Sequence, residues 1–301
     1  MRLTIQFCTY KRPQLLARVL EACFDQTLAP EQYEVVLVND GSPDETPEVI
    51  ERMRPIARCG FEVIHQPNGG LAKARNAGIA RARGERIVFI DDDVLPTPRF
   101  AAEHVRSDDE HGDVIVRGGV INTQSFDHLP PPIWSIANYS GNYFWTTNVS
   151  LRRSRLDAVG GQFDDSFSEY GWEDIELGMR LRAIGTQGVF NKDALTFHYK
   201  PHAKGTNVAG MLRQVRAQAR TGIQLERKHP HWRVALAIGN TPAQRFLGAA
   251  FARSGIARRI APLVGDVQSD RTLGIVQRAA ASLLATDAYY DELSKVPHPS
   301  A

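Results

Sequence analysis

The sequence predicts an α/β fold with a mixed, mostly parallel sheet flanked by helices, followed by a helical C-terminal extension. Strand and helix patterns alternate through the first hundred residues, as they do in βαβ units. Polar clusters follow three of the strand patterns, and ligands of such sheets collect beyond the carboxyl ends of the strands. From about residue 206 onward the apolar pattern is helical.

The first hundred residues supply most of the strand signals. The segment YEVVLVND, over 33–40, is a near-continuous apolar run of the kind found in strands buried on both faces. Pro13 suits the first turn of a helix that runs to about Phe24, and Gly84 ends a later helix that two glycines open. Strands are expected at 3–8, 33–40, 61–66 and 86–93, with helices between them and another at 99–111.

After the first hundred residues, the predicted secondary structure includes a long loop and, near the end, a run of helices. Residues 122–142 have no periodicity and predict a long loop, which is usually a functional or mobile segment. Further strands are expected at 113–121, 143–153 and 195–199, and helices at 172–185, 208–228, 242–255 and 271–290. We therefore expect one domain over 1–205 and a helical extension over 206–301.

The composition is that of an ordinary globular protein, with 43% hydrophobic and 23% charged residues. The sequence has no run of 18 apolar residues, so no membrane-spanning helix is expected, and the polar stretch TYKR argues against a signal peptide. The cysteines, Cys8, Cys23 and Cys59, form no CxxC pair, which fits a reducing cytosol better than a disulfide framework. We expect a cytoplasmic protein.

The charges are balanced overall but unevenly placed. Lys and Arg number 36 against 34 Asp and Glu, so no nucleic-acid partner is expected. From residue 201 onward, 14 Lys and Arg face only 6 Asp and Glu, whereas the first 200 residues carry a net charge of −6. An acidic body with a basic tail suits a metal site in the first part and contacts with anions in the second.

Three consecutive carboxylates, Asp91, Asp92 and Asp93, follow the apolar run RIVFI. On the expected strand over 86–93, alternation puts Asp91 and Asp93 on one face. Two carboxylates converging at a strand end make an oxygen site for Mg²⁺ or Mn²⁺, often completed by substrate phosphates. The alternative is a solvated acidic turn.

A second polar cluster surrounds the segment NGGLAKARNAG. The glycines Gly69 and Gly70 stand at a helix start, where backbone N–H groups favour anions such as a diphosphate. Lys73 and Arg75 oppose the helix dipole there, although a solvated basic face would explain them too. Asp40 follows another strand and suits either a base edge or a turn that starts the next helix. Neither GxxxxGK[ST] nor GxGxxG is present, which disfavours a P-loop NTPase and a Rossmann dehydrogenase.

The segment EYGWED places two acids, Glu173 and Asp174, beside Trp172 at the start of a helix. Acidic residues in a first turn complement the helix dipole, so the pair alone does not indicate a function. Beside aromatic rings that suit sugar faces, a carboxylate can act as a general base on a hydroxyl. His198 lies in the apolar stretch LTFHY, where a lone histidine is usually a core residue.

Four separated motifs then occur in order, and together they resemble the family-two glycosyltransferases of GT-A fold over roughly residues 1–200. They are IQFCTYKRPQLLARVLEACFDQT, VVLVNDGSPDET, NGGLAKARNAGIARARGERIVFIDDDV and WEDIELGMRLRAIG. The stretch from GWED to FHY is also similar to the galactosyltransferase and polypeptide N-acetylgalactosaminyltransferase branches.

The resemblance implies a nucleotide-diphosphate sugar donor, often a UDP-sugar, and a divalent metal, Mn²⁺ or Mg²⁺. It implies that the nucleotide lies near Thr9, Tyr10 and Asp40, with Arg75 and Lys73 near the diphosphate. It assigns Asp91 and Asp93 to a DxD motif, with His198 completing the metal site and Asp92 in an ambiguous frame. Asp174 becomes the base that deprotonates the acceptor, Glu173 orients it, and Trp145, Asn148 and Trp172 become candidate sugar contacts.

The expected reaction is transfer with inversion to a saccharide, lipid-linked or small-molecule acceptor. A retaining transferase and a non-catalytic nucleotide-sugar-binding module remain alternatives, and a nucleotidyltransferase is a weaker one. The tail segment FLGAAFARSGIARRIAPLV, at 246–264, mixes apolar residues with arginines. It predicts either peripheral contact with an anionic inner membrane face or a helical subdomain that packs on a protein surface.

Overall fold

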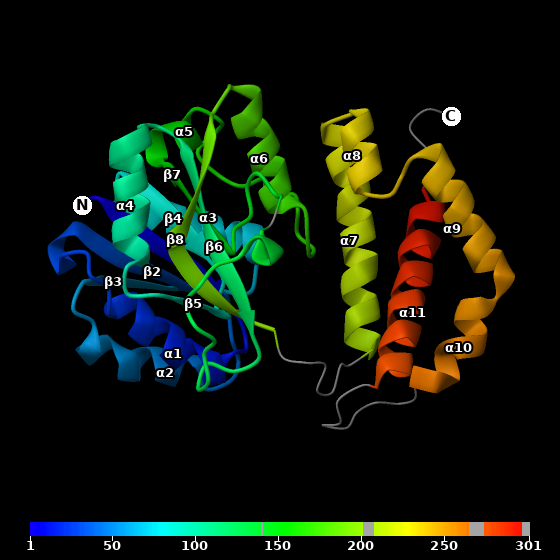
Figure 1. Ribbon diagram of the computed structural model, residues 1–301, viewed down its shortest axis with the longest axis horizontal. Helices are drawn as coiled ribbons and strands as arrows, with labels where there is room; N and C mark the ends of the chain where they lie inside the picture. The colour runs from blue at the N-terminus through cyan, green and yellow to red at the C-terminus, as the bar shows by residue number, and fades with distance from the viewer. Residues whose placement is uncertain (140, 201–207, 265–273, 297–301) are drawn as a thin grey trace. The chain divides into compact units, whose positions relative to one another are not determined.

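The computed structural model describes residues 1–139, 141–200, 208–264 and 274–296. It divides into two compact units (Figure 1). The sheet unit comprises residues 1–168 and 173–200, and the helical unit comprises residues 169–172 and the chain from 201 onward. The domain boundary expected between residues 205 and 206 lies outside the described residues.

Within the described residues the sheet unit contains one sheet of eight strands, in the order β3-β2-β1-β4-β7-β6-β8-β5. β1 (Leu3–Thr9) lies between β2 (Tyr33–Asn39) and β4 (Arg86–Ile90) and is parallel to both. β3 (Gly60–His65) extends this parallel half at the edge. The carboxyl ends of these four strands therefore point the same way.

The other half of the sheet is mixed. β7 (Asn148–Arg152) runs antiparallel between β4 and β6 (Ile115–Thr123). β8 (Gly188–Tyr199) is parallel to β6, and the short edge strand β5 (Val94–Pro96) is antiparallel to β8. The expected α/β class with a mixed, mostly parallel sheet is confirmed.

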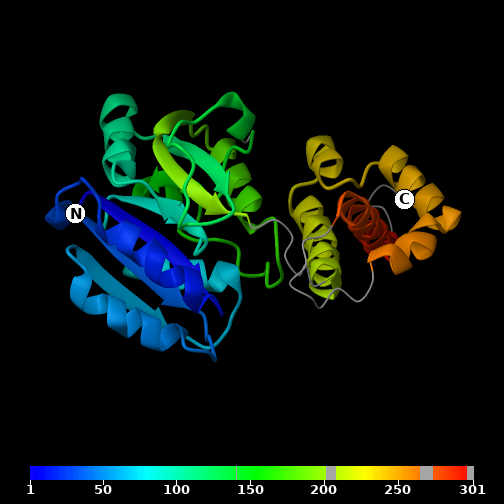
Figure 2. The same ribbon diagram turned by 60° about the horizontal axis from the view of Figure 1, so that its bottom comes forward.

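Helices cover both faces of the sheet (Figure 2). Leu3, Ile5 and Phe7 alternate along β1 and are fully or almost fully buried in one core, because side chains at i, i+2 and i+4 of a strand share a face. The helices of this core are α1 (Pro13–Phe24), α2 (Thr46–Met53) and α4 (Phe100–His111). The opposite face packs α3 (Leu71–Arg81) and α6 (Glu173–Ala183) around Phe89 and Phe163.

Most expected elements are present, with shifted ends. β4 stops at Ile90 and not at residue 93, and β7 begins at Asn148 and not at 143. β8 begins seven residues before the expected residue 195. The unexpected elements are short: β5, α5 (Arg153–Asp157), α8 (Trp232–Ala237) and α10 (Ile256–Val264). Among its described residues, the 122–142 loop contains one 3₁₀ turn, Ile136–Asn138, beyond the end of β6.

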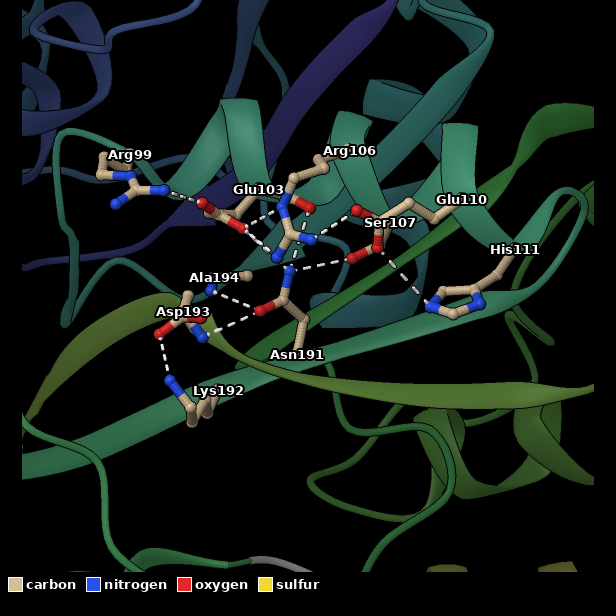
Figure 3. Close-up of polar contacts among 10 residues, drawn as sticks. All are labelled: Arg99, Glu103, Arg106, Ser107, Glu110, His111, Asn191, Lys192, Asp193 and Ala194. Carbon is tan, nitrogen blue, oxygen red and sulfur yellow. Dashed lines mark hydrogen bonds and ion pairs between the residues drawn. The ribbon is translucent and has the colours of Figure 1, made fainter.

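A bulge in β8 is clamped to α4. Gly118 of β6 pairs with Asn191, but the next residue pairs with Leu195, so three residues of β8 bulge outward. Figure 3 shows Asn191 reaching toward α4, where its Nδ2 donates to Ser107 Oγ (2.9 Å) and to the Glu103 backbone carbonyl (3.2 Å). Bulges redirect the strand that follows them. This clamp therefore sets the path of the segment of β8 that leads to residue 198.

The helical unit is organised around α11 (Ile275–Ser294), which packs against α7 (Val208–Lys228) and against α9 (Pro242–Ser254) and α10. Gly248 lets α9 lie directly against Tyr290 of α11, because a Cβ at this position would be only 2.4 Å from the Tyr290 ring. Thr241 caps α9 through the Gln244 amide, and Gly255 ends the helix in a left-handed conformation. None of the described helices is long and apolar enough to cross a membrane.

We predict that Asn191→Ala lowers the free energy of unfolding by about 1–3 kcal/mol, because the bulge and α4 lose a buried hydrogen-bonded side chain. Urea denaturation of the full chain measures this change. The matched control is Lys192→Ala, an exposed neighbour in the same bulge, which should stay within about 0.5 kcal/mol of the wild type. Equal losses in the two variants would show that Asn191 is not the clamp.

Candidate active site

The three aspartates lie in the turn that joins β4 to β5, beyond the strand end. The expectation that Asp91 and Asp93 share a strand face is therefore wrong: Asp91 contacts Arg75 and Thr147, whereas Asp93 contacts Arg12 and His198. The turn is fixed at both sides of the site: Thr9 Oγ1 of β1 donates to Asp92 Oδ2 (2.8 Å), and the Tyr199 amide of β8 donates to the Asp93 carbonyl (2.8 Å).

Asp93 lies between the Arg12 guanidinium and the His198 imidazole. Arg12 Nη1 is 2.6 Å from Asp93 Oδ2, and His198 Nε2 is 3.4 Å from Asp93 Oδ1. Burial raises the pKa of Asp93, but the hydrogen bond from His198 and the charge of Arg12 outweigh this and lower it to about 2. Asp93 is therefore a firmly ionised carboxylate.

Asp92 differs from its neighbour because desolvation dominates. Its burial raises the pKa to about 6, although Arg12 Nη1 at 3.2 Å and the Thr9 hydroxyl favour the charged form. Adjacent carboxylates of the same turn thus have pKa values shifted in opposite directions. Arg12, which the sequence reasoning did not single out, contacts both.

The histidine is placed at the acidic turn by strand pairing. His198 of β8 pairs with Val94 of β5 and with Asn122 of β6. Its ring is 4% exposed, its Nδ1 has no hydrogen-bond partner, and the Trp145 ring centroid lies 6.2 Å away. A buried imidazole with an unsatisfied nitrogen beside an ionised carboxylate is suited to completing its contacts with a cation.

In the described part of the chain, no three His, Cys, Asp or Glu side chains converge in a way that would hold a metal by themselves. Asp93 and His198 offer one oxygen and one nitrogen ligand. That pair fits a divalent cation such as Mn²⁺, whose other positions substrate phosphates and water can fill. Asp91, the expected third ligand, is engaged instead by Arg75 Nη2 (3.2 Å) and by Thr147 Oγ1 (3.0 Å).

A buried guanidinium connects the acidic turn to α6. Arg75 of α3 is 3% exposed, and its Nη1 is 2.7 Å from Glu173 Oε1. Its Nη2 donates to Asp91 and to Thr146 Oγ1 (2.6 Å). The guanidinium also lies 5.3 Å from the Phe163 ring centroid. Arg75 therefore holds carboxylates from two segments about eighty residues apart in the sequence.

The acids at the start of α6 have different surroundings. Glu173 is buried and ion-paired with Arg75. Asp174 is also desolvated, and its burial beside the Glu173 charge raises its pKa to about 7. Trp172, which precedes them, adopts a left-handed backbone conformation with φ of 72°, and its Nε1 donates to the Gln218 carbonyl of α7 (2.9 Å). Trp172 thus belongs to the helical unit, although it directly precedes α6.

The glycine-rich start of α3 already holds an anion. The amides of Gly69 and Gly70 donate to the two carboxylate oxygens of Asp40, at 2.9 and 3.0 Å, and Gln66 Nε2 donates to the first of these oxygens (2.7 Å). The expectation that these amides are free for a diphosphate is wrong, because the chain supplies its own carboxylate. Gly70 has a φ of 86°, which a residue with a Cβ rarely adopts.

The other expected site residues differ in how far they are exposed to solvent. Tyr10 is 42% exposed beside the Lys11 ammonium, and Lys73 is exposed on α3. Asn148 is 4% exposed, and its Nδ2 donates to the Gly119 and Ala194 carbonyls of β6 and β8. The Asn148 side-chain amide thus links β7 to β6 and β8, whereas the Trp145 ring lies beside the His198 ring.

Comparison with known proteins identifies the family. The model of the family Glycosyl transferase family 2 matches residues 4–163 of this chain. The chain belongs to this family. It is 29% identical over 220 residues to the validoxylamine A glucosyltransferase of Streptomyces hygroscopicus subsp. limoneus, a match that covers 61% of this chain and 48% of that protein. The chain spans about half the length of the curated relatives it matches.

Solved structures of glycosyltransferases share the fold of this family-two chain. The mannosyltransferase PcManGT from Pyrobaculum calidifontis, in complex with GDP-Man and Mn²⁺, has a TM-score of 0.62 at 16% identity, over 97% of this chain and 87% of that one. GalNAc-T7 with UDP, GalNAc and Mn²⁺ has a TM-score of 0.56 at 14% identity, over 72% and 47%. The resemblance noted in the sequence is confirmed at the level of fold.

We predict that Arg75→Leu lowers the free energy of unfolding by about 3–5 kcal/mol, because it leaves Glu173 buried without a counter-charge. Thermal and urea unfolding of the full chain measure the loss. Lys73→Leu, a change two residues earlier on the exposed face of the same helix, serves as the control and should be nearly neutral. A neutral Arg75→Leu would mean that the acidic segments need no internal cation.

Proposed function

We propose that this family-two protein transfers a sugar from a nucleotide-diphosphate sugar to an acceptor hydroxyl. The observation that carries the proposal is the meeting of Asp93 and His198 at one end of the sheet, with Arg75 linking Asp91 of the same turn to the acids of α6. The neighbours of known structure support the class of donor, because their complexes contain GDP-Man or UDP.

The ion that binds together with the sugar donor is Mn²⁺ or Mg²⁺, and the protein residues that would hold it are Asp93 and His198. Such a cation acts as a Lewis acid that neutralises the charge developing on the leaving diphosphate. The Asp91 side chain is 31% exposed, so in addition to its bonds from Arg75 and Thr147 its carboxylate can accept a hydrogen bond from a ribose hydroxyl or a bound water. Both neighbour complexes named above contain Mn²⁺.

Asp174 is the general base. Its raised pKa keeps it close to the pH at which a base works best, and it is the α6 acid that Arg75 does not neutralise by direct contact. In the proposed step, Asp174 accepts the proton of the acceptor hydroxyl while the hydroxyl oxygen attacks the anomeric carbon. The bond from that carbon to the diphosphate breaks on the opposite side, which gives inversion. Glu173, which is ion-paired with Arg75, fixes the start of α6 on which Asp174 lies.

The nucleotide contacts involve residues around the end of β1. We expect Thr9, Tyr10 and Asp40 to contact the nucleotide's base and ribose, and Lys73 to contact the diphosphate, because Thr9 ends β1 and Asp40 directly follows β2. Trp145, beside His198, offers an aromatic face to the transferred sugar. UDP is our first choice of nucleotide because the GalNAc-T7 complex contains it, and a screen of nucleotide sugars for Mn²⁺-dependent hydrolysis tests that choice.

The reaction class has two alternatives. In a retaining transferase, Asp174 would not be a base, and NMR of the product anomer separates retention from inversion. In a module that only binds nucleotide sugars, the donor would stabilise the protein without turnover. The ionised Asp93 and the raised pKa of Asp174 favour the enzyme, because binding alone needs no base.

The acceptor is a saccharide, a lipid-linked saccharide or a small molecule, and we propose that the helical unit contacts an anionic membrane where lipid-linked acceptors reside. Residues 227–265 contain seven Lys and Arg and no Asp or Glu. Exposed apolar residues share this stretch: Phe246 and Leu247 of α9 are 72% and 65% exposed, and Leu263 of α10 is 52% exposed. Exposed apolar side chains among cations are typical of interfacial helices.

We predict that Asp174→Asn abolishes most transfer but still binds donor, because only the proton acceptor is lost. A positioned base contributes about 10²–10⁴-fold in rate. Asp93→Ala should lose both metal and donor binding, because Asp93 is the carboxylate paired with His198. Transfer assays with calorimetric titration of UDP and Mn²⁺ measure both effects.

A pH profile checks the base assignment independently. In the wild type, kcat/KM should rise with pH and level off above about 7, because the raised pKa leaves Asp174 protonated in acid. Asp165→Asn, an acidic residue in the loop before α6, is the matched control and should keep both rate and profile. Full activity in Asp174→Asn would remove the base assignment.

We predict that the full chain floats with vesicles containing about one third phosphatidylglycerol and does not float with pure phosphatidylcholine. A double change of Phe246 and Leu247 to serine should reduce flotation about tenfold or more, since both side chains are exposed and their loss leaves the core intact. Ile133→Ser, an equally exposed apolar residue of the sheet unit, is the control. Loss of vesicle binding to a competing oligonucleotide would instead indicate a nucleic-acid surface.

A further inference from the structure

Arg12 places a positive charge beside the three consecutive aspartates. It follows Lys11, whose φ of 58° is rare for a residue with a Cβ and whose amide donates to Ser42 Oγ (3.1 Å). This turn at the end of β1 directs Arg12 toward the acidic turn, where Nη1 lies 2.6 Å from Asp93 and 3.2 Å from Asp92. A single guanidinium nitrogen thus contacts two of the three consecutive aspartates.

Both carboxylate oxygens of Asp93 are engaged. Arg12 contacts Oδ2, and His198 contacts Oδ1. A divalent cation shared by Asp93 and His198 would compete with the guanidinium for the same carboxylate charge, because two cations close together on one carboxylate repel each other. Binding at this position therefore weakens or breaks the contact between Arg12 and Asp93.

The Arg12 side chain can leave without disturbing the core. It is 47% exposed, in contrast to Arg75, which is buried and held by three side-chain acceptors. A guanidinium has a planar set of donors that matches a phosphate as well as a carboxylate. A diphosphate that arrives beside Asp93 offers Arg12 a new anionic partner at the moment it loses the old one.

We propose that Arg12 neutralises the acidic turn before the donor binds and transfers its ion pair from Asp93 to the donor diphosphate when the metal–nucleotide complex arrives. The proposal rests on the proposed metal-dependent function of the same site. Arg12 then opposes binding of the metal alone and favours binding of metal with nucleotide. Metal and nucleotide each raise the other's affinity, because such coupling is reciprocal.

Mn²⁺ titration followed by electron paramagnetic resonance tests the proposal on the full chain, with and without UDP. Removing the Arg12 charge should have opposite effects in the two titrations. For Arg12→Ala, Mn²⁺ alone should bind about tenfold tighter or more, and UDP in saturating Mn²⁺ should bind about tenfold weaker or more, as expected for one lost charged hydrogen bond. Arg12→Gln, which keeps a hydrogen-bond donor without the charge, should change each affinity in the same direction as Arg12→Ala does: tighter for Mn²⁺ alone and weaker for UDP.

Arg18→Ala is the matched control, because Arg18 is an exposed arginine of α1 that donates to the Phe126 carbonyl and not to the aspartates. Its two affinities should equal those of the wild type. Unchanged Mn²⁺ affinity in both Arg12 variants, or a fall in both titrations, would overturn the role of Arg12 while leaving the metal-dependent function intact. No binding of Mn²⁺ with UDP to the wild type would overturn the proposed function as well.

Discussion

The Arg75 guanidinium is the charge on which the arrangement of the site depends. It is buried against Phe163 and is ion-paired with Glu173 of α6 and Asp91 of the acidic turn. A buried cation without its carboxylates, or buried carboxylates without their cation, costs several kcal/mol. The two acidic segments are therefore held at one end of the sheet by a mutual requirement and not by the sheet alone.

Other charged groups around the site are also paired with partners from the chain itself. Asp40 occupies the amides of Gly69 and Gly70, and Arg12 neutralises Asp93. Groups that a sequence motif presents as open to ligand are thus satisfied within the chain. Ligand binding in such a site proceeds by exchange of partners, and an exposed partner such as Arg12 exchanges more easily than a buried one.

The boundary between the two units lies directly before the acidic helix α6. The sheet unit supplies α6, whereas residues 169–172 pack with α7 of the helical unit through Trp172 and Thr221. The successive left-handed residues Gly171 and Trp172 mark the change of unit directly before Glu173. The chain therefore links the helical unit covalently to the start of α6, and sequence patterns gave no sign of this connection.

The sequence by itself determined the alternating elements, the carboxylate-rich strand ends and the family, because buried strands and amphipathic helices leave periodic apolar patterns. It placed α1 over the residues that the structure assigns. It did not determine where Asp91 and Asp93 point, since a strand that ends three residues earlier removes the alternation. Only the tertiary structure decided that Arg12 contacts Asp93, that Arg75 reaches Glu173, and that β8 brings His198 to the turn. These are contacts between distant segments, whose geometry depends on strand register, a bulge and burial that no local pattern encodes.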